Sequence, residues 1–177
     1  MAMQELDIPL NRDLFFRTMI RSFAKSLENT VGMEEAEGYV SLVGSEVGNW
    51  IEDQYREAAG KDNFTPQEVA ELLVDLKRRI GGDFYIKSVD DEKIVLGNRE
   101  CPFGQLAEGR PSLCHMTSNV FGRITANQLG YARIDLPKTI ARGHDGCLIV
   151  IHLDSDGRDE GEVDQEFFRI DESLAAE

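Results

Sequence analysis

The spacing of apolar residues changes at Gly81-Gly82, and this change constrains the fold more than any other feature of the sequence. Before the two glycines, apolar side chains recur every three or four residues, which is the period of a helix with one buried face. After them, segments 83–89 and 93–96 alternate apolar and polar residues, which is typical of β-strands. The chain therefore begins with helices and continues into a sheet.

Three helices are predicted before the glycines. The first covers residues 11–29, with Asn11 as its N-cap, and the second covers 34–59. The third has the clearest start, because Thr65-Pro66-Gln67-Glu68 combines a capping box with proline at the first helical position. Its apolar stripe is expected to be buried and consists of Val69, Leu72, Leu73, Leu76 and Ile80.

Beyond the first hairpin, a helix is predicted over 113–129, capped by Ser112, and strands over 131–135 and 147–153. The predicted fold class is therefore α+β, with N-terminal helices packed on a small antiparallel sheet in the order α-α-α-β-β-α-β-β. Residues 1–153 are expected to form one domain. Residues 154–177 read as an acidic tail, docked locally by Phe167, Phe168 and Ile170.

The net charge excludes several kinds of partner. The chain has 33 acidic and 19 basic residues, a formal net charge of −14, and no basic stripe. Such a surface repels phosphate groups, so nucleic acid and bare anionic membrane are not expected partners. No apolar run has transmembrane length, and the first residues lack a basic region followed by an apolar core. The expected location is the cytoplasm.

Three cysteines carry the chemistry that stands out. Cys101, Cys114 and Cys147 are separated by twelve and thirty-two residues, and each lies where a predicted element begins or a loop ends. An odd number of cysteines argues against a disulfide framework. Thiolates are ligands for zinc and for iron–sulfur clusters, so these three residues are candidate cofactor and metal ligands. We expect them to converge at one edge of the sheet.

Two histidines are candidates for a fourth ligand. His144 lies in a glycine-flanked loop close to Cys147, and His115 follows Cys114 directly. The alternative is that the cysteines are structural, because free cysteine is among the most buried residue types. The residues alone leave both interpretations open. No nucleophile elbow, phosphate loop or Ser/His/Asp arrangement is present, so we do not expect an enzyme.

Several motifs in this region resemble the methanogen output domain family. They are Cys101-Pro-Phe-Gly, Pro-Ser-Leu-Cys114, Asn119-Val-Phe-Gly122 and the run Ala-Arg-Gly-His-Asp-Gly-Cys at 141–147. The similarity covers nearly all of residues 10–153. It implies a prokaryotic signalling domain related to vinyl-reductase-like sensor domains. The cysteine order is also similar to the cluster-binding region of iron–sulfur assembly repressors, which implies that the three cysteines ligate a cluster or metal.

Three functions follow as expectations. The first is a sensor that binds zinc or an iron–sulfur cluster through the cysteines. The second is a sensor of a small apolar ligand, and the third is an interaction module that docks a signalling protein. A homodimer built on the first two helices is expected because both are long and amphipathic. Gly44 and Gly48, on one face of the second helix, would allow another helix to approach closely.

Overall fold

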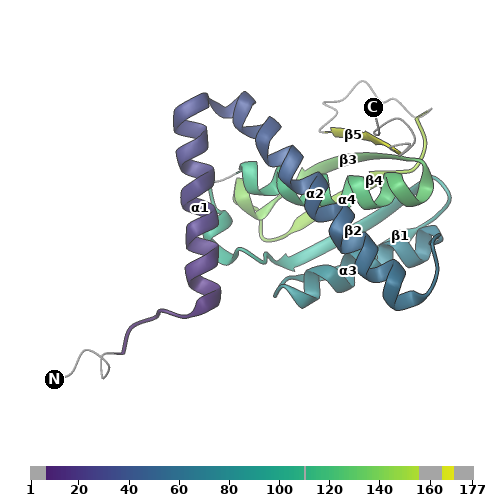
Figure 1. Cartoon of the computed structure of the whole chain (residues 1–177), viewed down its shortest axis with the longest axis horizontal. Helices are drawn as coiled ribbons and strands as arrows, with labels where there is room; N and C mark the ends of the chain where they lie inside the picture. The colour runs from purple at the N-terminus through teal and green to yellow at the C-terminus, as the bar shows by residue number, and fades with distance from the viewer. Residues whose placement is uncertain (1–6, 110, 156–164, 170–177) are drawn as a thin grey trace.

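The computed structural model describes residues 7–109, 111–155 and 165–169, and its architecture is α+β as predicted (Figure 1). All eight predicted elements are present, and two short 3-10 helices and a fifth strand are added to them. In chain order the elements are α1 (Arg12–Val31), α2 (Met33–Ala59), α3 (Pro66–Arg79), β1 (Asp83–Val89), β2 (Lys93–Glu100), η2 (Gly104–Ala107), α4 (Pro111–Leu129), β3 (Tyr131–Lys138), η3 (Ile140–Arg142), β4 (Cys147–His152) and β5 (Gln165–Phe168).

The described strands form one antiparallel sheet in the order β1-β2-β4-β3-β5. In the β2–β4 register, Asn98 is paired with Cys147. The end of β2 therefore lies beside the start of β4. Because Cys101 directly follows β2, this register brings Cys101 and Cys147 to the same end of the sheet.

The core lies between the sheet and helices α3 and α4. Phe121 and Ile124 of α4 are fully buried with Leu73 of α3 and with Ile134 and Ile151 of the sheet. Each such side chain stabilises the fold by about 1.5–3 kcal/mol relative to an exposed one. The capping box of α3 is confirmed, because Thr65 Oγ1 accepts from Glu68 N and Glu68 Oε2 accepts from Thr65 N. Ile80, at the end of the predicted stripe, is exposed.

Helix α2 packs across the outer side of α4 (Figure 1). A Cβ atom added at Gly44 would lie 2.5 Å from the Cβ of Asn119, and one at Gly48 would lie 3.2 Å from the Cβ of Arg123. The predicted close helix contact at the two glycines is therefore confirmed. Its partner is α4 of the same chain, so the glycines do not support the predicted dimer.

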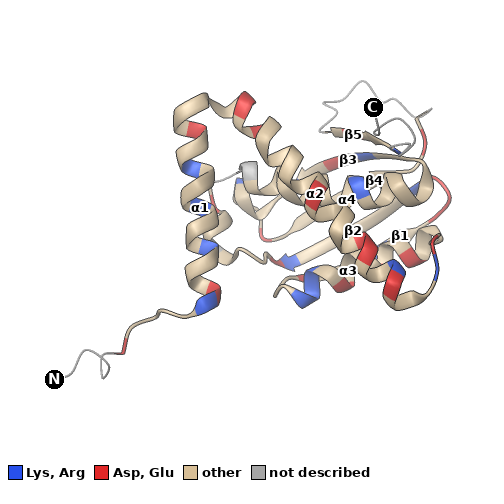
Figure 2. Cartoon of the chain, in the orientation of Figure 1, with Lys and Arg blue, Asp and Glu red and all other residues tan. Residues whose placement is uncertain are grey.

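Helix α1 is helical as predicted but is not buried along its apolar stripe. Among its described residues only Ala24 is buried, whereas Phe16 and Phe23 are 49% and 68% exposed. Ile20 and Leu27 are half-buried. Figure 2 shows both basic and acidic residues on α1 and mainly acidic residues on α2.

The region expected to be an acidic tail contributes a strand. Residues 165–168 form β5 on the edge of β3, and Phe167 is buried over Gly122 of α4. The predicted local docking by Phe167 is thus present, Phe168 is exposed, and Ile170 lies outside the described residues. Helix α4 begins at Pro111, so Ser112 lies inside its first turn and the predicted cap is wrong.

None of the helices in the described parts of the chain is long and apolar enough to cross a membrane.

Candidate functional site

The three cysteines line one pocket, named here the cysteine pocket. Cys101 follows β2, Cys147 begins β4, and Cys114 lies in the first turns of α4. The cavity volume is about 30 Å³, close to the share of one water molecule. The pocket therefore has room for a single small species. Its other lining residues are Phe84, Asn98, Pro102, Phe103, Ala107, Leu113, Thr117, Leu136, Thr139 and Ile149.

Hydrogen-bond donors approach the sulfur of Cys147 from two sides. The side-chain amide of Asn98 donates to Sγ at 3.6 Å, and the main-chain N–H of Ile140 donates at 3.4 Å. Asn98 is itself buried and fixed, because its Oδ1 accepts from Glu100 N at 2.8 Å. The sulfur of Cys147 thus acts as an acceptor.

Burial is the main influence on the other two thiols, and it outweighs the smaller lowering of their pKa values by main-chain groups near Cys101 and by the Thr139 side chain near Cys114. It raises the pKa of Cys101 and raises that of Cys114 to about 11. Both thiols are therefore protonated at neutral pH.

A buried lysine that the sequence analysis missed completes this environment. Lys77 of α3 is 4% exposed, and its Nζ donates to Thr117 Oγ1 at 2.9 Å. Nζ also lies 5.1 Å and 5.6 Å from the ring centres of Phe121 and Phe84, within the range of cation–π attraction. Burial lowers the pKa of Lys77 to about 8, and the three cysteines act in the opposite direction. Lys77 is not itself a lining residue, but Thr117 and Phe84, which it contacts, both line the pocket.

The two candidate histidines lie elsewhere. His115 Nε2 is 3.4 Å from Glu37 Oε1 of α2, and His144 Nδ1 is 3.0 Å from the main-chain oxygen of Thr139. Neither histidine lines the cysteine pocket. Metal ligation by His115 or His144 stays a prediction, and neither side chain lies beside the three cysteines.

The cysteine pocket fits a soft metal ion by its donor chemistry. Three thiols face one small volume with hydrogen-bond donors behind them, which is how thiolate ligands are commonly supported. As the side chains stand, the described residues contain no group of three His, Cys, Asp or Glu placed to hold a metal ion. Metal ligation would therefore require Cys101, Cys114 and Cys147 to rotate toward a common point.

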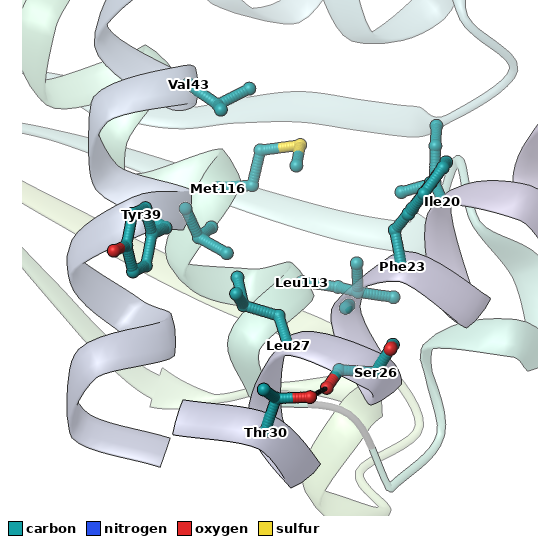
Figure 3. Close-up of a pocket in the computed structure, with 11 residues that line it drawn as sticks. Ile20, Phe23, Ser26, Leu27, Thr30, Tyr39, Val43, Leu113 and Met116 are labelled. Carbon is teal, nitrogen blue, oxygen red and sulfur yellow. Dashed lines mark hydrogen bonds between the residues drawn. The ribbon is translucent and has the colours of Figure 1, made fainter. Parts of the chain in front are cut away.

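A second and larger cavity, named here the apolar cavity, lies between α1, α2 and α4 (Figure 3). Its volume is about 500 Å³. Phe23 and Leu27 of α1 point toward Leu113 and Met116 of α4, and Tyr39 closes one side (Figure 3). One face of α1, with Ile20, Phe23 and Leu27, therefore lines a cavity. The remaining lining residues are Ile20, Ala24, Ser26, Thr30, Val40 and Val43.

The two cavities share a wall. Leu113 lines the apolar cavity and also the cysteine pocket, and it directly precedes Cys114 in α4. Leu113 is 2% exposed. Anything that moves this side chain in one cavity alters the shape of the other.

A solved structure has the same fold as this chain. It is the phenol-responsive sensory domain of the transcription activator PoxR, in complex with phenol. The TM-score is 0.63 at 16% sequence identity, and the match covers 86% of this chain and 83% of the PoxR domain. No curated protein matches the sequence.

The family model for methanogen output domain 1 matches residues 19–152, which include the apolar cavity's α2 and α4 walls and all three cysteines. A match over this share of the sequence confirms the predicted family. The chain belongs to the methanogen output domain 1 family.

Proposed function

We propose that this regulatory domain senses a small, largely apolar molecule that binds in the apolar cavity. The observation that carries the proposal is the cavity itself, whose volume of about 500 Å³ lies within the usual range for small-molecule sites. The fold shared with a phenol-responsive sensory domain supports the same class of ligand. The role is regulatory and not enzymatic.

The lining indicates the chemistry of the ligand. Most of the surrounding side chains are aliphatic or aromatic, and the hydroxyl of Thr30 already donates to the main-chain oxygen of Ser26 at 2.7 Å. Tyr39 is half exposed at the edge and can offer one hydroxyl. A compact ring or short chain with at most one or two polar atoms fits this lining, because binding energy would come from burying apolar surface.

Calorimetric titration with phenol and with toluene tests the proposal. Ala24→Leu places a larger side chain in the cavity wall and should weaken binding of both probes by about tenfold or more. Ser22→Leu, at an exposed position of the same helix, is the matched control and should leave binding unchanged. If these two apolar probes and a panel of related aromatic compounds all fail to bind the wild type, the sensor proposal is wrong.

A second candidate function is binding of zinc or an iron–sulfur cluster by Cys101, Cys114 and Cys147. The observation that favours it is that these residues line one pocket and that two donors approach the sulfur of Cys147. Anaerobic purification followed by an absorbance spectrum and metal analysis tests it. Stoichiometric metal in the wild type and its loss in Cys114→Ser would support the assignment. Metal-free protein after purification and after reconstitution would reject it.

A homodimer, or a signalling protein docked on the same face, accounts for the apolar side chains left exposed on α1 and α2. Phe23, Tyr39, Leu42, Val43 and Trp50 are each at least 48% exposed, which is an unusual density of apolar side chains on a monomer. A second copy is the occupant we favour, because one two-fold interface covers the patch on both chains. Sedimentation should show a dimer at micromolar concentration that Leu42→Glu dissociates. A wild type that remains monomeric would contradict the dimer, and a signalling protein would then be the expected partner of this face.

A further inference from the structure

We propose that the groove between α2 and α3 is a docking site for a helix of another protein. The docking helix carries an apolar side chain and, about two helical turns away, a basic side chain. The groove consists of two adjoining hollows with cavity volumes of about 390 and 260 Å³, named here the Trp50 hollow and the Glu71 hollow. Tyr55 lines both hollows, and neither shares a lining residue with the apolar cavity or the cysteine pocket.

The Trp50 hollow suits an apolar side chain. Trp50 and Ile80 are 63% and 56% exposed, so a guest that covers them removes apolar surface from water. The charge of Arg79 is already compensated, because its Nε donates to Asp75 Oδ2 at 2.6 Å. The same carboxylate accepts from the Tyr55 hydroxyl at 2.6 Å. The rest of the lining is Ile51, Gln54, Ala58 and Leu76.

The Glu71 hollow suits a basic side chain. Three carboxylates line it, and two of them are already paired, Glu68 with Lys61 and Asp75 with Arg79. Glu71 is exposed and, within the described residues, has no ion pair with a lysine or arginine. An arginine or lysine of a partner would therefore find a carboxylate that is free to pair with it.

The arrangement of the two hollows favours a helix as the occupant. Glu71 and Arg79, one from each hollow, are eight residues apart on α3, which corresponds to about 12 Å along the helix axis. A partner helix lying beside α3 spans the same distance in about two turns. Extended peptides bind by adding a strand to a sheet edge, whereas amphipathic helices bind in apolar grooves. This groove is formed by α2 and α3 (Figure 1).

Charge argues against a second copy of this chain in the groove. A two-fold interface places the same surface of both copies face to face. Here it would bring Glu68, Glu71 and Asp75 of one copy close to the same carboxylates of the other, which like-charge repulsion opposes. The chain as a whole carries a formal net charge of −14. A basic helix of another protein has the complementary charge.

The fluorescence of Trp50 provides the test, because it is the one tryptophan of the chain. Two alanine-rich helical peptides are titrated: one has leucine and arginine eight residues apart, and the other has glutamate in place of the arginine. The arginine peptide should shift Trp50 emission to shorter wavelength, since contact removes the ring from water. It should bind about two- to fivefold more tightly than the glutamate peptide, as expected for one exposed ion pair. Glu71→Lys should reverse this preference.

Ile80→Ser tests the apolar contact. It should weaken binding of the arginine peptide by about tenfold, because an anchor of the Trp50 hollow is lost. Leu10→Ser, at an exposed position outside the groove, is the matched control and should bind as the wild type does. Trp50 also borders the exposed face of α1 and α2, so the titration is repeated with Leu42→Glu, in which the charge preference should persist.

Three results would overturn the proposal. If neither peptide changes Trp50 emission at millimolar concentration, the groove is not a docking site for such a helix. Equal binding of the two peptides to both the wild type and Glu71→Lys would reject the basic side chain. A saturable change of Trp50 emission with toluene, in the absence of any change with the peptides, would identify the Trp50 hollow as a small-molecule site instead.

Discussion

Arg17 of α1 donates a hydrogen bond from Nη1 to the main-chain oxygen of Pro102, the residue that follows Cys101 (3.3 Å). One turn further along α1, Arg21 donates to the main-chain oxygen of Leu106. Helix α1 therefore forms one wall of the apolar cavity and also holds the segment that closes the cysteine pocket. Because Ala24 is the one residue of α1 that is fully buried, these two hydrogen bonds add to its packing on α2 and α4 in fixing its position.

Removal of both arginines should release α1 and the 101–107 segment together. In the double variant Arg17→Met/Arg21→Met, amide hydrogen exchange should become faster in both segments, because each loses the contacts that order it. Exchange in α3 and the central strands should be unchanged. Lys25→Met, at an exposed position of the same helix, is the control. Faster exchange in α1 alone would show that the helix does not order the cysteine segment.

The predictable part of this structure is the part governed by local periodicity and caps. The capping box at Thr65 and the strand 83–89 are where the sequence indicates them, because the backbone pattern there depends on near neighbours. The surface that covers the apolar face of α1 could not be predicted, since an apolar stripe does not reveal what packs against it. Lys77 was overlooked although it follows Val69 and Leu73 at intervals of four, on the buried face of its helix. A charged residue at a position of the buried stripe therefore indicates a buried charge, and this could have been predicted from the sequence.

Two glycines of α2 should respond oppositely to the same substitution. A Cβ at Gly38 would meet nothing within 4 Å, so Gly38→Ala should stabilise the protein by about 1 kcal/mol through helix propensity. A Cβ at Gly44 would lie 2.5 Å from the Cβ of Asn119, so Gly44→Ala should force α2 away from α4 and destabilise by about 1–3 kcal/mol. Urea unfolding of both variants measures the difference. Equal effects would mean that α2 does not pack tightly on α4.

Leu113→Ala should affect both cavities at once. Removal of this buried side chain should cost about 2–5 kcal/mol in the free energy of unfolding, because a void opens between the two cavities. Phenol affinity and Zn²⁺ affinity should both change. In the wild type, each ligand should alter the affinity of the other by the same factor, as linkage requires. Leu42→Ala, at an exposed position, should change neither. Independent binding of phenol and Zn²⁺ in the wild type would show that the shared wall does not couple the sites.

In the metal-free protein, buried Lys77 should lower the free energy of unfolding by an amount that depends on pH. Burial lowers the pKa of Lys77 from 10.5 to about 8 in the folded state, so between these values the unfolded chain binds more protons than the folded one. Stability contributed by this group therefore rises with pH across that window, and the full cost, roughly 3 kcal/mol, is present below pH 8.

Lys77→Met isolates this cost. With metal removed by a chelator and thiols kept reduced, the Met variant should be more stable than wild type at pH 7, because methionine fills a similar volume without a charge. The advantage should shrink steadily as the pH is raised from 8 toward 10, since wild-type Lys77 then becomes neutral in the folded state. Urea unfolding at pH 7, 8.5 and 9.5 measures it. An advantage that does not change with pH would show that the ammonium of Lys77 is not held as a buried charge.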